Sequence, residues 1–152
     1  MSIVEKPVVL LVDDNEATCT LITAVLQRDF LTDVASDGIE AIEKLKTKQY
    51  AAILLDIRMP QLDGYGVLDH IQATRPEALR TVLIVTAALS QRELARMDAY
   101  DVCAIIPKPF DVEVLLAAVK QCAAPADNFP GGSFFKSTMM LLLADLIQKR
   151  LM

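Results

Sequence analysis

The sequence predicts an α/β protein built on a doubly wound, five-stranded parallel sheet, and three observations predict it. Short, nearly continuous apolar runs alternate along the chain with longer stretches in which apolar residues recur at helical spacing. Parallel strands that are covered on both faces have this composition, because neither face meets water. Polar residues directly follow several of the apolar runs, and ligands of open α/β sheets bind beyond the carboxyl ends of the strands.

Each strand is predicted from its own composition. Four near-continuous apolar runs read as buried strands, at Val8–Val12 and at residues 51–55, 82–85 and 103–106. A more polar run at residues 32–35 reads as an edge strand.

The segments between these runs are predicted to be helices. Four of them carry apolar residues on one helical face: Leu21, Ile22, Val25 and Leu26; Ile39, Ile42 and Leu45; Val67, Leu68 and Ile71; and Val112, Leu115, Leu116 and Val119. The fourth helix in chain order is predicted from its start, because Ser90 and Glu93 have the spacing of a capping box. The fifth helix is predicted to start at Asp111. Five strand–helix units in this order predict right-handed crossovers.

Composition and charge narrow the class of function. The chain has 152 residues, of which 53% are hydrophobic, enough for one domain core and an appendage. The net charge of −5 comes without a dense Lys/Arg block, which argues against direct binding of nucleic acid. The N-terminal segment lacks a long apolar stretch with a small-residue cleavage site, so we expect a cytoplasmic protein.

The cysteines give no sign of a metal site. Cys19, Cys103 and Cys122 are scattered and show no C-x-x-C spacing. This pattern suggests neither a zinc site nor a disulfide framework. We therefore expect reduced cysteines in the core or on helix faces.

Five polar side chains follow the predicted strands and define a candidate site. They are Asp13 and Asp14 after the first strand, Asp56 after the third, Thr86 after the fourth and Lys108 after the fifth. Crowded carboxylates repel one another unless a cation neutralises them, and oxygen ligands of this kind suit Mg²⁺. Taken alone, the acidic pair also reads as a turn that caps the next helix. Together with Asp56 and Lys108 it favours a carboxylate that accepts a phosphoryl group.

Four motifs occur in order on the predicted elements, LLVDDN, LLDIRMPQLDGYG, VTAA and KPF. With this combination the chain resembles a response-regulator receiver domain of bacterial two-component signalling over roughly residues 6–123. The resemblance implies a flavodoxin-like sheet in the strand order 2-1-3-4-5. It also implies a phosphoryl group taken from a sensor histidine kinase or a phosphotransfer protein. Such a chain catalyses only its own phosphorylation and dephosphorylation, and it signals by changed contacts with a downstream protein target.

The resemblance further implies how the phosphoryl group is held. Asp56 is the phosphoacceptor, Lys108 pairs with the phosphoryl oxygens, and Thr86 moves to hydrogen-bond them. The peptide between Lys108 and Pro109 is cis in proteins that this chain resembles, a state that is realistic only before proline.

The resemblance also implies a set of Mg²⁺ ligands. Asp14 and Asp56 bind the ion directly, and the backbone carbonyl of Arg58 supplies another ligand. Asp13 contributes through a water molecule.

The chain departs from the family pattern at a position that many receivers use for output. Three residues before the lysine, where many receivers carry Tyr or Phe, this chain has Ile105. The usual coupling between the threonine and an aromatic ring therefore cannot operate in its standard form. Arg58 and Ala88 occupy positions that influence phosphoryl lifetime in the family, and Arg58 either shields the phosphoryl group from water or extends into solvent. Candidate residues for the changed contacts, near the fourth helix and fifth strand, are Leu94, Met97, Tyr100 and Ile105.

Two other classes of function stay open. A non-phosphorylated pseudo-receiver would act only as an interaction module, but such proteins commonly lose an acid or the lysine, and this chain retains them. A haloacid-dehalogenase-like aspartyl phosphatase needs a second Asp two residues after the nucleophile, where this chain has Arg58. FMN binding is disfavoured because Asp13 and Asp14 would repel a phosphate after the first strand.

The end of the chain is predicted to form a separate element. Residues 124–135 are rich in Pro, Gly, Asn and Asp and read as a linker. Residues 136–152 read as an apolar helix, with a run too short to span a bilayer. Its broad apolar face must be covered, first of all by its own domain or by a second copy in a homodimer. A partner, a membrane surface or the start of a larger output domain stay open.

Overall fold

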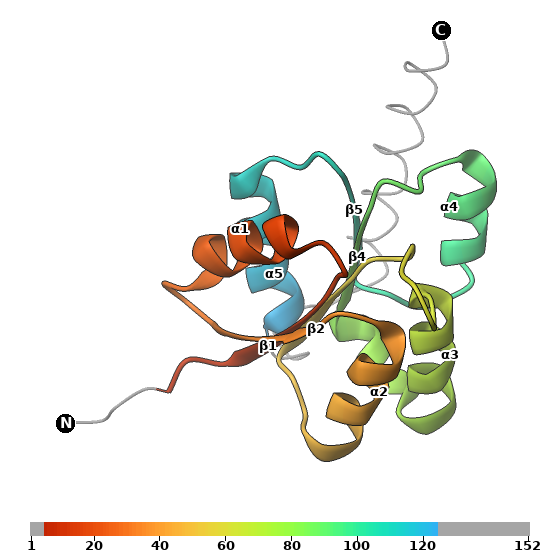
Figure 1. The fold of residues 1–152 in the computed structure, drawn as a ribbon, viewed down its shortest axis with the longest axis horizontal. Coiled ribbons are helices and arrows are strands. Elements are labelled where there is room, and N and C mark those ends of the chain that lie inside the picture. Colours follow the sequence, from red (N-terminus) through yellow and green to blue (C-terminus); the bar gives the residue numbers. More distant parts are fainter. Residues whose placement is uncertain (1–4, 125–152) are drawn as a thin grey trace, which may run out of the picture.

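A computed structural model describes residues 5–124, which form a five-stranded parallel sheet in the order β2-β1-β3-β4-β5 (Figure 1). The strands are β1 (Val8–Val12), β2 (Leu31–Ala35), β3 (Ala52–Leu55), β4 (Val82–Thr86) and β5 (Ala104–Pro107). The helices are α1 (Glu16–Leu26), α2 (Gly38–Thr47), α3 (Gly64–Thr74), the 3₁₀ helix η1 (Pro76–Thr81), α4 (Gln91–Met97) and α5 (Val112–Ala123). The doubly wound fold and its strand order are confirmed, whereas η1 was not predicted.

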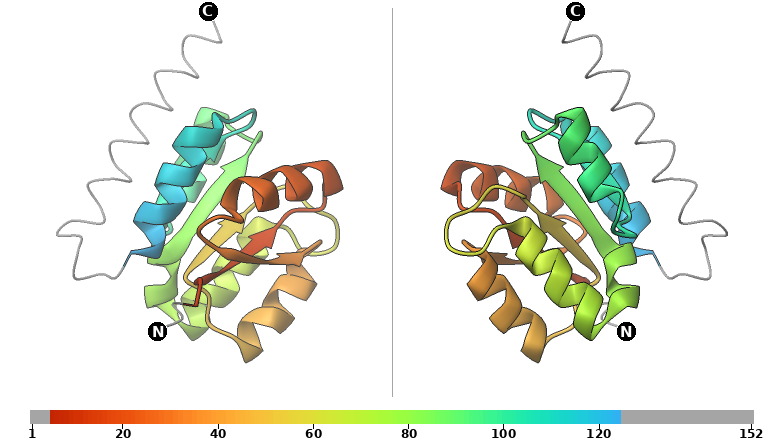
Figure 2. Two further views of the ribbon diagram at one scale, coloured as in Figure 1. Left: turned by 90° about the vertical axis from the view of Figure 1, so that its left-hand side faces the viewer. Right: turned by 90° about the vertical axis from the view of Figure 1, so that its right-hand side faces the viewer.

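Helices cover both faces of the sheet (Figures 1 and 2). Val9 and Leu11 of β1 pack with residues of α1 and α5, whereas Leu10 and Val12 pack with residues of α2, α3 and α4. Successive strand residues point to opposite faces, and all four are buried. Burial on both sides is the reason that the strand reads as a continuous apolar run.

Polar caps begin the five α-helices of residues 5–124. Each starts after an Asn, Asp or Ser whose side chain accepts a backbone N–H of the first turn, which satisfies donors that the helix itself leaves unpaired. Asp111 caps α5 as predicted, and the Ser90 hydroxyl accepts the Glu93 N–H at 3.0 Å. The predicted capping box is only half-formed, because the Glu93 carboxylate is engaged by the Tyr65 hydroxyl of α3.

Two residues predicted to lie on buried helix faces are exposed. Leu21 of α1 and Ile39 of α2 have exposed fractions of 50% and 53%. The buried stripe of α1 instead runs through Ile22 and Leu26, and α2 buries Ala41. Successive helical residues are rotated by about 100°, so Leu21 turns aside from the stripe that starts at its neighbour.

The residues proposed for changed contacts lie inside the domain. Leu94, Met97, Tyr100 and Ile105 are at most 8% exposed and belong to the core beneath α2, α3 and α4. They support this region from within and do not form its accessible surface. Val112, predicted on the buried face of α5, is 44% exposed.

The prediction of three reduced cysteines is wrong for two of them. Cys103 and Cys122 form a disulfide, with Cα atoms 5.8 Å apart, and Cys19 is free. The paired residues are separated by 19 positions, so no short motif indicates the bond. It forms because the start of β5 packs against the last turn of α5.

Most of the predicted C-terminal region lies outside the described residues. The linker at 124–135 and the apolar helix at 136–152 therefore stay predictions, except that Ala124 is the C-cap of α5. Among residues 5–124, none of the helices combines the length and apolarity that crossing a bilayer requires.

Candidate functional site

β1 and β3 deliver two buried carboxylates to the same edge of the sheet. Asp13 follows β1, and its backbone N–H donates to the Ala35 carbonyl at 3.1 Å. Asp56 follows β3, and its N–H donates to the Val12 carbonyl at 3.0 Å. Asp13 and Asp56 are 3% and 8% exposed. The sheet ladder thus continues one residue past each strand and fixes both carboxylates at its end.

Lys108 joins these carboxylates from the end of β5. Its backbone N–H donates to the Thr86 carbonyl at 3.0 Å, and the Lys108–Pro109 peptide is cis, as the resemblance implied. The ammonium Nζ donates to Asp13 Oδ2 at 2.6 Å and to Asp56 Oδ2 at 3.0 Å. Burial by itself lowers the pKa of Lys108, but the hydrogen bonds and charges of the two carboxylates outweigh it and raise the pKa above its ordinary value. The ammonium therefore stays charged at neutral pH.

Backbone N–H groups hold the other oxygen of each carboxylate. The Asn15 N–H donates to Asp13 Oδ1 at 2.9 Å, and the Arg58 N–H donates to Asp56 Oδ1 at 3.3 Å. Both carboxylates are thus oriented before any ligand binds.

Asp14 completes a cluster that fits a divalent cation. One oxygen from each of Asp13, Asp14 and Asp56 lies within 4.8 Å of the others. Asp14 is exposed while the other two are buried, so the cluster opens to solvent on one side. One ammonium cannot balance three carboxylates, and an all-oxygen donor set beside water suits Mg²⁺, which keeps several water ligands.

Thr86 lies at the same sheet edge but makes a different contact. It is fully buried as the last residue of β4, and its hydroxyl accepts the Ala88 N–H at 3.1 Å. Within residues 5–124 that is the hydrogen bond made by the hydroxyl, and it does not reach the carboxylates. The structure thus joins four of the five predicted side chains directly and Thr86 through the Lys108 backbone.

Comparison with known proteins decides the family. Residues 9–120 match the family model described as the response regulator receiver domain. The chain belongs to this receiver domain family. The receiver domain is 33% identical over 113 residues to Response regulator MprA of Mycobacterium ulcerans (strain Agy99), covering 74% of this chain and 48% of MprA. It is 30% identical over 141 residues to Transcriptional regulatory protein ZraR of Klebsiella oxytoca, covering 86% of this chain and 31% of ZraR. The chain therefore spans about half or less of the length of these curated relatives.

Solved receiver domains share the fold. The receiver domain of the Francisella response regulator 1452 has a TM-score of 0.69 at 28% identity, covering 78% of this chain and 97% of that chain. The receiver domain of the sensor histidine kinase PA1611 from Pseudomonas aeruginosa PAO1 has a TM-score of 0.70 at 28% identity, covering 78% and 98%. That structure contains a magnesium ion in its active-site cleft.

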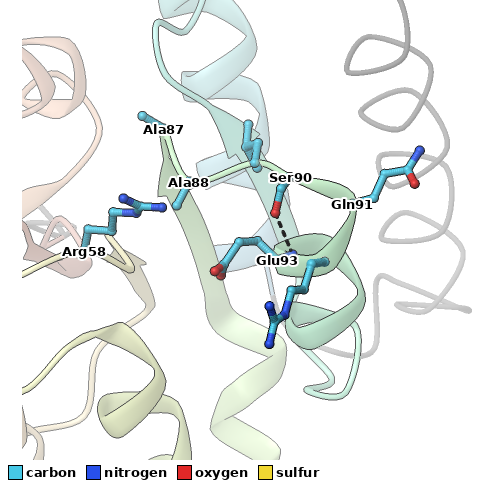
Figure 3. Close-up of a pocket in the computed structure, with 8 residues that line it drawn as sticks. Arg58, Ala87, Ala88, Ser90, Gln91 and Glu93 are labelled. Atoms are coloured by element: carbon cyan, nitrogen blue, oxygen red, sulfur yellow. Dashed lines mark hydrogen bonds between the residues drawn. The ribbon is translucent and has the colours of Figure 1, made fainter. Parts of the chain in front are cut away.

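A cavity of about 620 Å³ adjoins the site of this receiver domain. Its lining consists of Arg58 and residues 87–93. Figure 3 shows the Arg58 side chain reaching from the loop after β3 toward Ala88 in the loop after β4. Arg58 is exposed, and Ala88 is buried. Arg58 thus lies along the cavity wall, next in sequence but one to Asp56.

A polar and aromatic network between α3 and α4 was missed by sequence reasoning. The Tyr65 hydroxyl donates to the Glu93 carboxylate, and the Arg96 guanidinium lies 3.6 Å from the Tyr65 ring centroid. The Tyr100 ring stacks on Tyr65 with centroids 6.3 Å apart, and its hydroxyl donates to Asp69 at 2.5 Å. Burial is the largest cause that raises the pKa of both tyrosines, for Tyr100 to about 12. The hydroxyls and their acceptors are 28 and 31 residues apart, so no local pattern could reveal them.

Proposed function

We propose that this receiver domain accepts a phosphoryl group on Asp56 from the phosphohistidine of a sensor histidine kinase or a phosphotransfer protein. The observation that carries the proposal is the position of the Lys108 ammonium, which bridges Asp13 and Asp56 beside the oxygen cluster completed by Asp14. Transfer of a phosphoryl group requires positive charge near the oxygens on which negative charge is spread. A buried carboxylate with a fixed cation at its side meets that requirement.

The transfer is a displacement at phosphorus. An oxygen of Asp56 attacks, the new O–P bond forms while the N–P bond to the donor imidazole breaks, and the imidazole nitrogen takes the electron pair of that bond. The product on this chain is an acyl phosphate. Lys108 Nζ, 3.0 Å from Asp56 Oδ2, is near enough to donate to the phosphoryl oxygens.

Mg²⁺ is the cofactor that fits the acidic cluster. Asp14 and Asp56 would bind it directly, together with the backbone carbonyl of Arg58, and Asp13 would contribute through water. When bound, the ion supplies positive charge that offsets the charge of the phosphoryl oxygens. Support for this set comes from the grouping of the three carboxylates and from their all-oxygen chemistry.

Thr86 is the residue that would report phosphorylation. Its hydroxyl is held by the Ala88 N–H, and a phosphoryl group on Asp56 offers it a stronger, charged acceptor. Donation to that acceptor would release Ala88 and shift the loop that leads into α4. Because Ile105 is fully buried and has no ring, we expect the shift to act on α4 and on its bond between Glu93 and Tyr65.

The output is proposed to be a change in protein contacts. We expect a downstream protein target in the cytoplasm, no direct contact of this receiver domain with nucleic acid, and homodimerisation through residues 136–152. Size-exclusion chromatography with light scattering, before and after phosphorylation, tests the homodimer. A state unchanged by phosphorylation and by deletion of residues 136–152 would contradict it.

The phosphoacceptor is tested by labelling the full chain with acetyl phosphate and Mg²⁺. Intact-mass measurement should show the gain of one phosphoryl group in the wild type and none in D56N. D29N is the matched control, because Asp29 is a surface carboxylate that pairs with Lys120 at 3.7 Å, and it should label like the wild type. Equal labelling of D56N and the wild type would contradict the proposal. Turnover of phosphate esters without a stable adduct would favour an aspartyl phosphatase instead.

A further inference from the structure

The disulfide between Cys103 and Cys122 connects the two ends of one structural unit. Cys103 directly precedes β5, and Cys122 lies in the last turn of α5. The segment that it closes contains β5, the turn with Lys108 and nearly all of α5. The bond itself lies at the opposite end of this unit from Lys108, because Lys108 follows β5 whereas Cys103 precedes it.

The two ends of the bond are anchored differently by the rest of the domain. The Cys103 N–H donates to the Val82 carbonyl at 2.8 Å, so β4 already holds this end. The last turn of α5 has weaker support, since its polar contacts are the Ala124 N–H to the Gln121 carbonyl at 3.3 Å and an exposed ion pair of Lys120. Exposed ion pairs contribute little. The disulfide is therefore the main restraint on the last turn of α5 besides apolar packing.

The two sulfurs also differ in access. Cys122 is 4% exposed, whereas Cys103 is partly exposed. Thiol–disulfide exchange requires a thiolate to reach one sulfur of the bond, and the Cys103 side offers that approach. Cys19 is not part of this pair, because its thiol donates to the Asp13 carbonyl at 3.4 Å.

We propose that Cys103 and Cys122 are a redox-responsive pair, reduced by small thiols through Cys103, and that reduction loosens the last turn of α5. In the first step a thiolate bonds to the Cys103 sulfur and Cys122 leaves as a thiolate. A second thiol then attacks the mixed disulfide, so that two small thiols become one disulfide and the protein gains two thiols. The last turn of α5 is where residues 125–152 continue the chain, so the redox state of the pair sets how firmly that point is held. The proposal is independent of phosphorylation of Asp56.

The experiment combines thiol counting with hydrogen exchange on the full chain. Alkylation in denaturant, read by mass, should find one reactive thiol after equilibration with oxidised glutathione and three after reduction, since the chain has three cysteines. Reduction should speed amide exchange in the last turn of α5 by about tenfold, as expected for a local opening, and leave α1 unchanged. The C19S variant should respond like the wild type. C103A/C122A should exchange fast in both conditions.

Three results would overturn the proposal. One is three reactive thiols under oxidising conditions. Another is equal exchange in the last turn of α5 before and after reduction. The third is an increase of equal size in α1, because reduction would then lower the stability of the whole domain and not of this turn.

Discussion

Replacing Lys108 by Met tests whether one ammonium holds the acidic cluster together. Met keeps much of the aliphatic stem but leaves the side chains of Asp13 and Asp56, which are 3% and 10% exposed, without their shared cation. Removing one partner of a buried ion pair typically costs ~3–5 kcal/mol. The Lys108 side chain is 19% exposed and Asp14 opens the cluster to water, so we expect the lower end, about 3 kcal/mol.

Urea unfolding followed by circular dichroism, with EDTA present, measures this loss. K108M should unfold at a lower urea concentration with an unchanged slope, which is the sign of altered stability without altered compactness. K120M is the matched control, because Lys120 is 53% exposed and its pair with Asp29 spans 3.7 Å. Such pairs contribute ~0–1 kcal/mol. Equal midpoint shifts in the two variants would refute the reasoning.

Addition of Mg²⁺ separates charge compensation from packing. A ligand that binds only the folded state stabilises it by about 2.7 kcal/mol at a concentration one hundred times its dissociation constant. Because the ammonium of Lys108 occupies oxygens of Asp13 and Asp56, K108M should gain more stability from Mg²⁺ than the wild type. An equal gain would show that the ammonium and the ion do not compete.

Other side chains give predictions of their own. D14N should bind Mg²⁺ about tenfold or more weakly by calorimetry, with stability in EDTA unchanged because Asp14 is exposed; unchanged affinity would remove it from the ligand set. G64A should lose about 2 kcal/mol or more in urea unfolding, because a Cβ on Gly64 would lie 2.5 Å from the Asp56 carbonyl oxygen. R58A should alter the lifetime of the acyl phosphate, and an unchanged half-life would dismiss shielding by Arg58. Burial is the largest cause that raises the pKa of Tyr50, Tyr65 and Tyr100. Their contribution to stability is therefore complete below the unfolded value of about 10 and is lost as pH rises through the folded values. Absorbance titration should show tyrosinate later in the folded chain than in urea; coincident curves would contradict this.

Much of the site could be predicted because it follows from strand direction. Asp13, Asp56 and Lys108 each directly follow an apolar run, and parallel strands bring their carboxyl ends to one edge. The pattern therefore places the three side chains in one neighbourhood without any knowledge of loops. The resemblance added the roles of the residues and the cis peptide before Pro109, which the structure contains.

The sequence by itself determined the alternation of strands and helices, since burial on both faces of a strand and on one stripe of a helix is written into residue order. Tertiary structure alone decided which distant groups meet. Lys108 reaches carboxylates 95 and 52 residues away, Cys103 pairs with Cys122, and Tyr65 donates to Glu93. Periodicity describes the direction of a side chain within its own element. The partner of that side chain depends on how two elements pack, and this is fixed by the whole core and not by either segment.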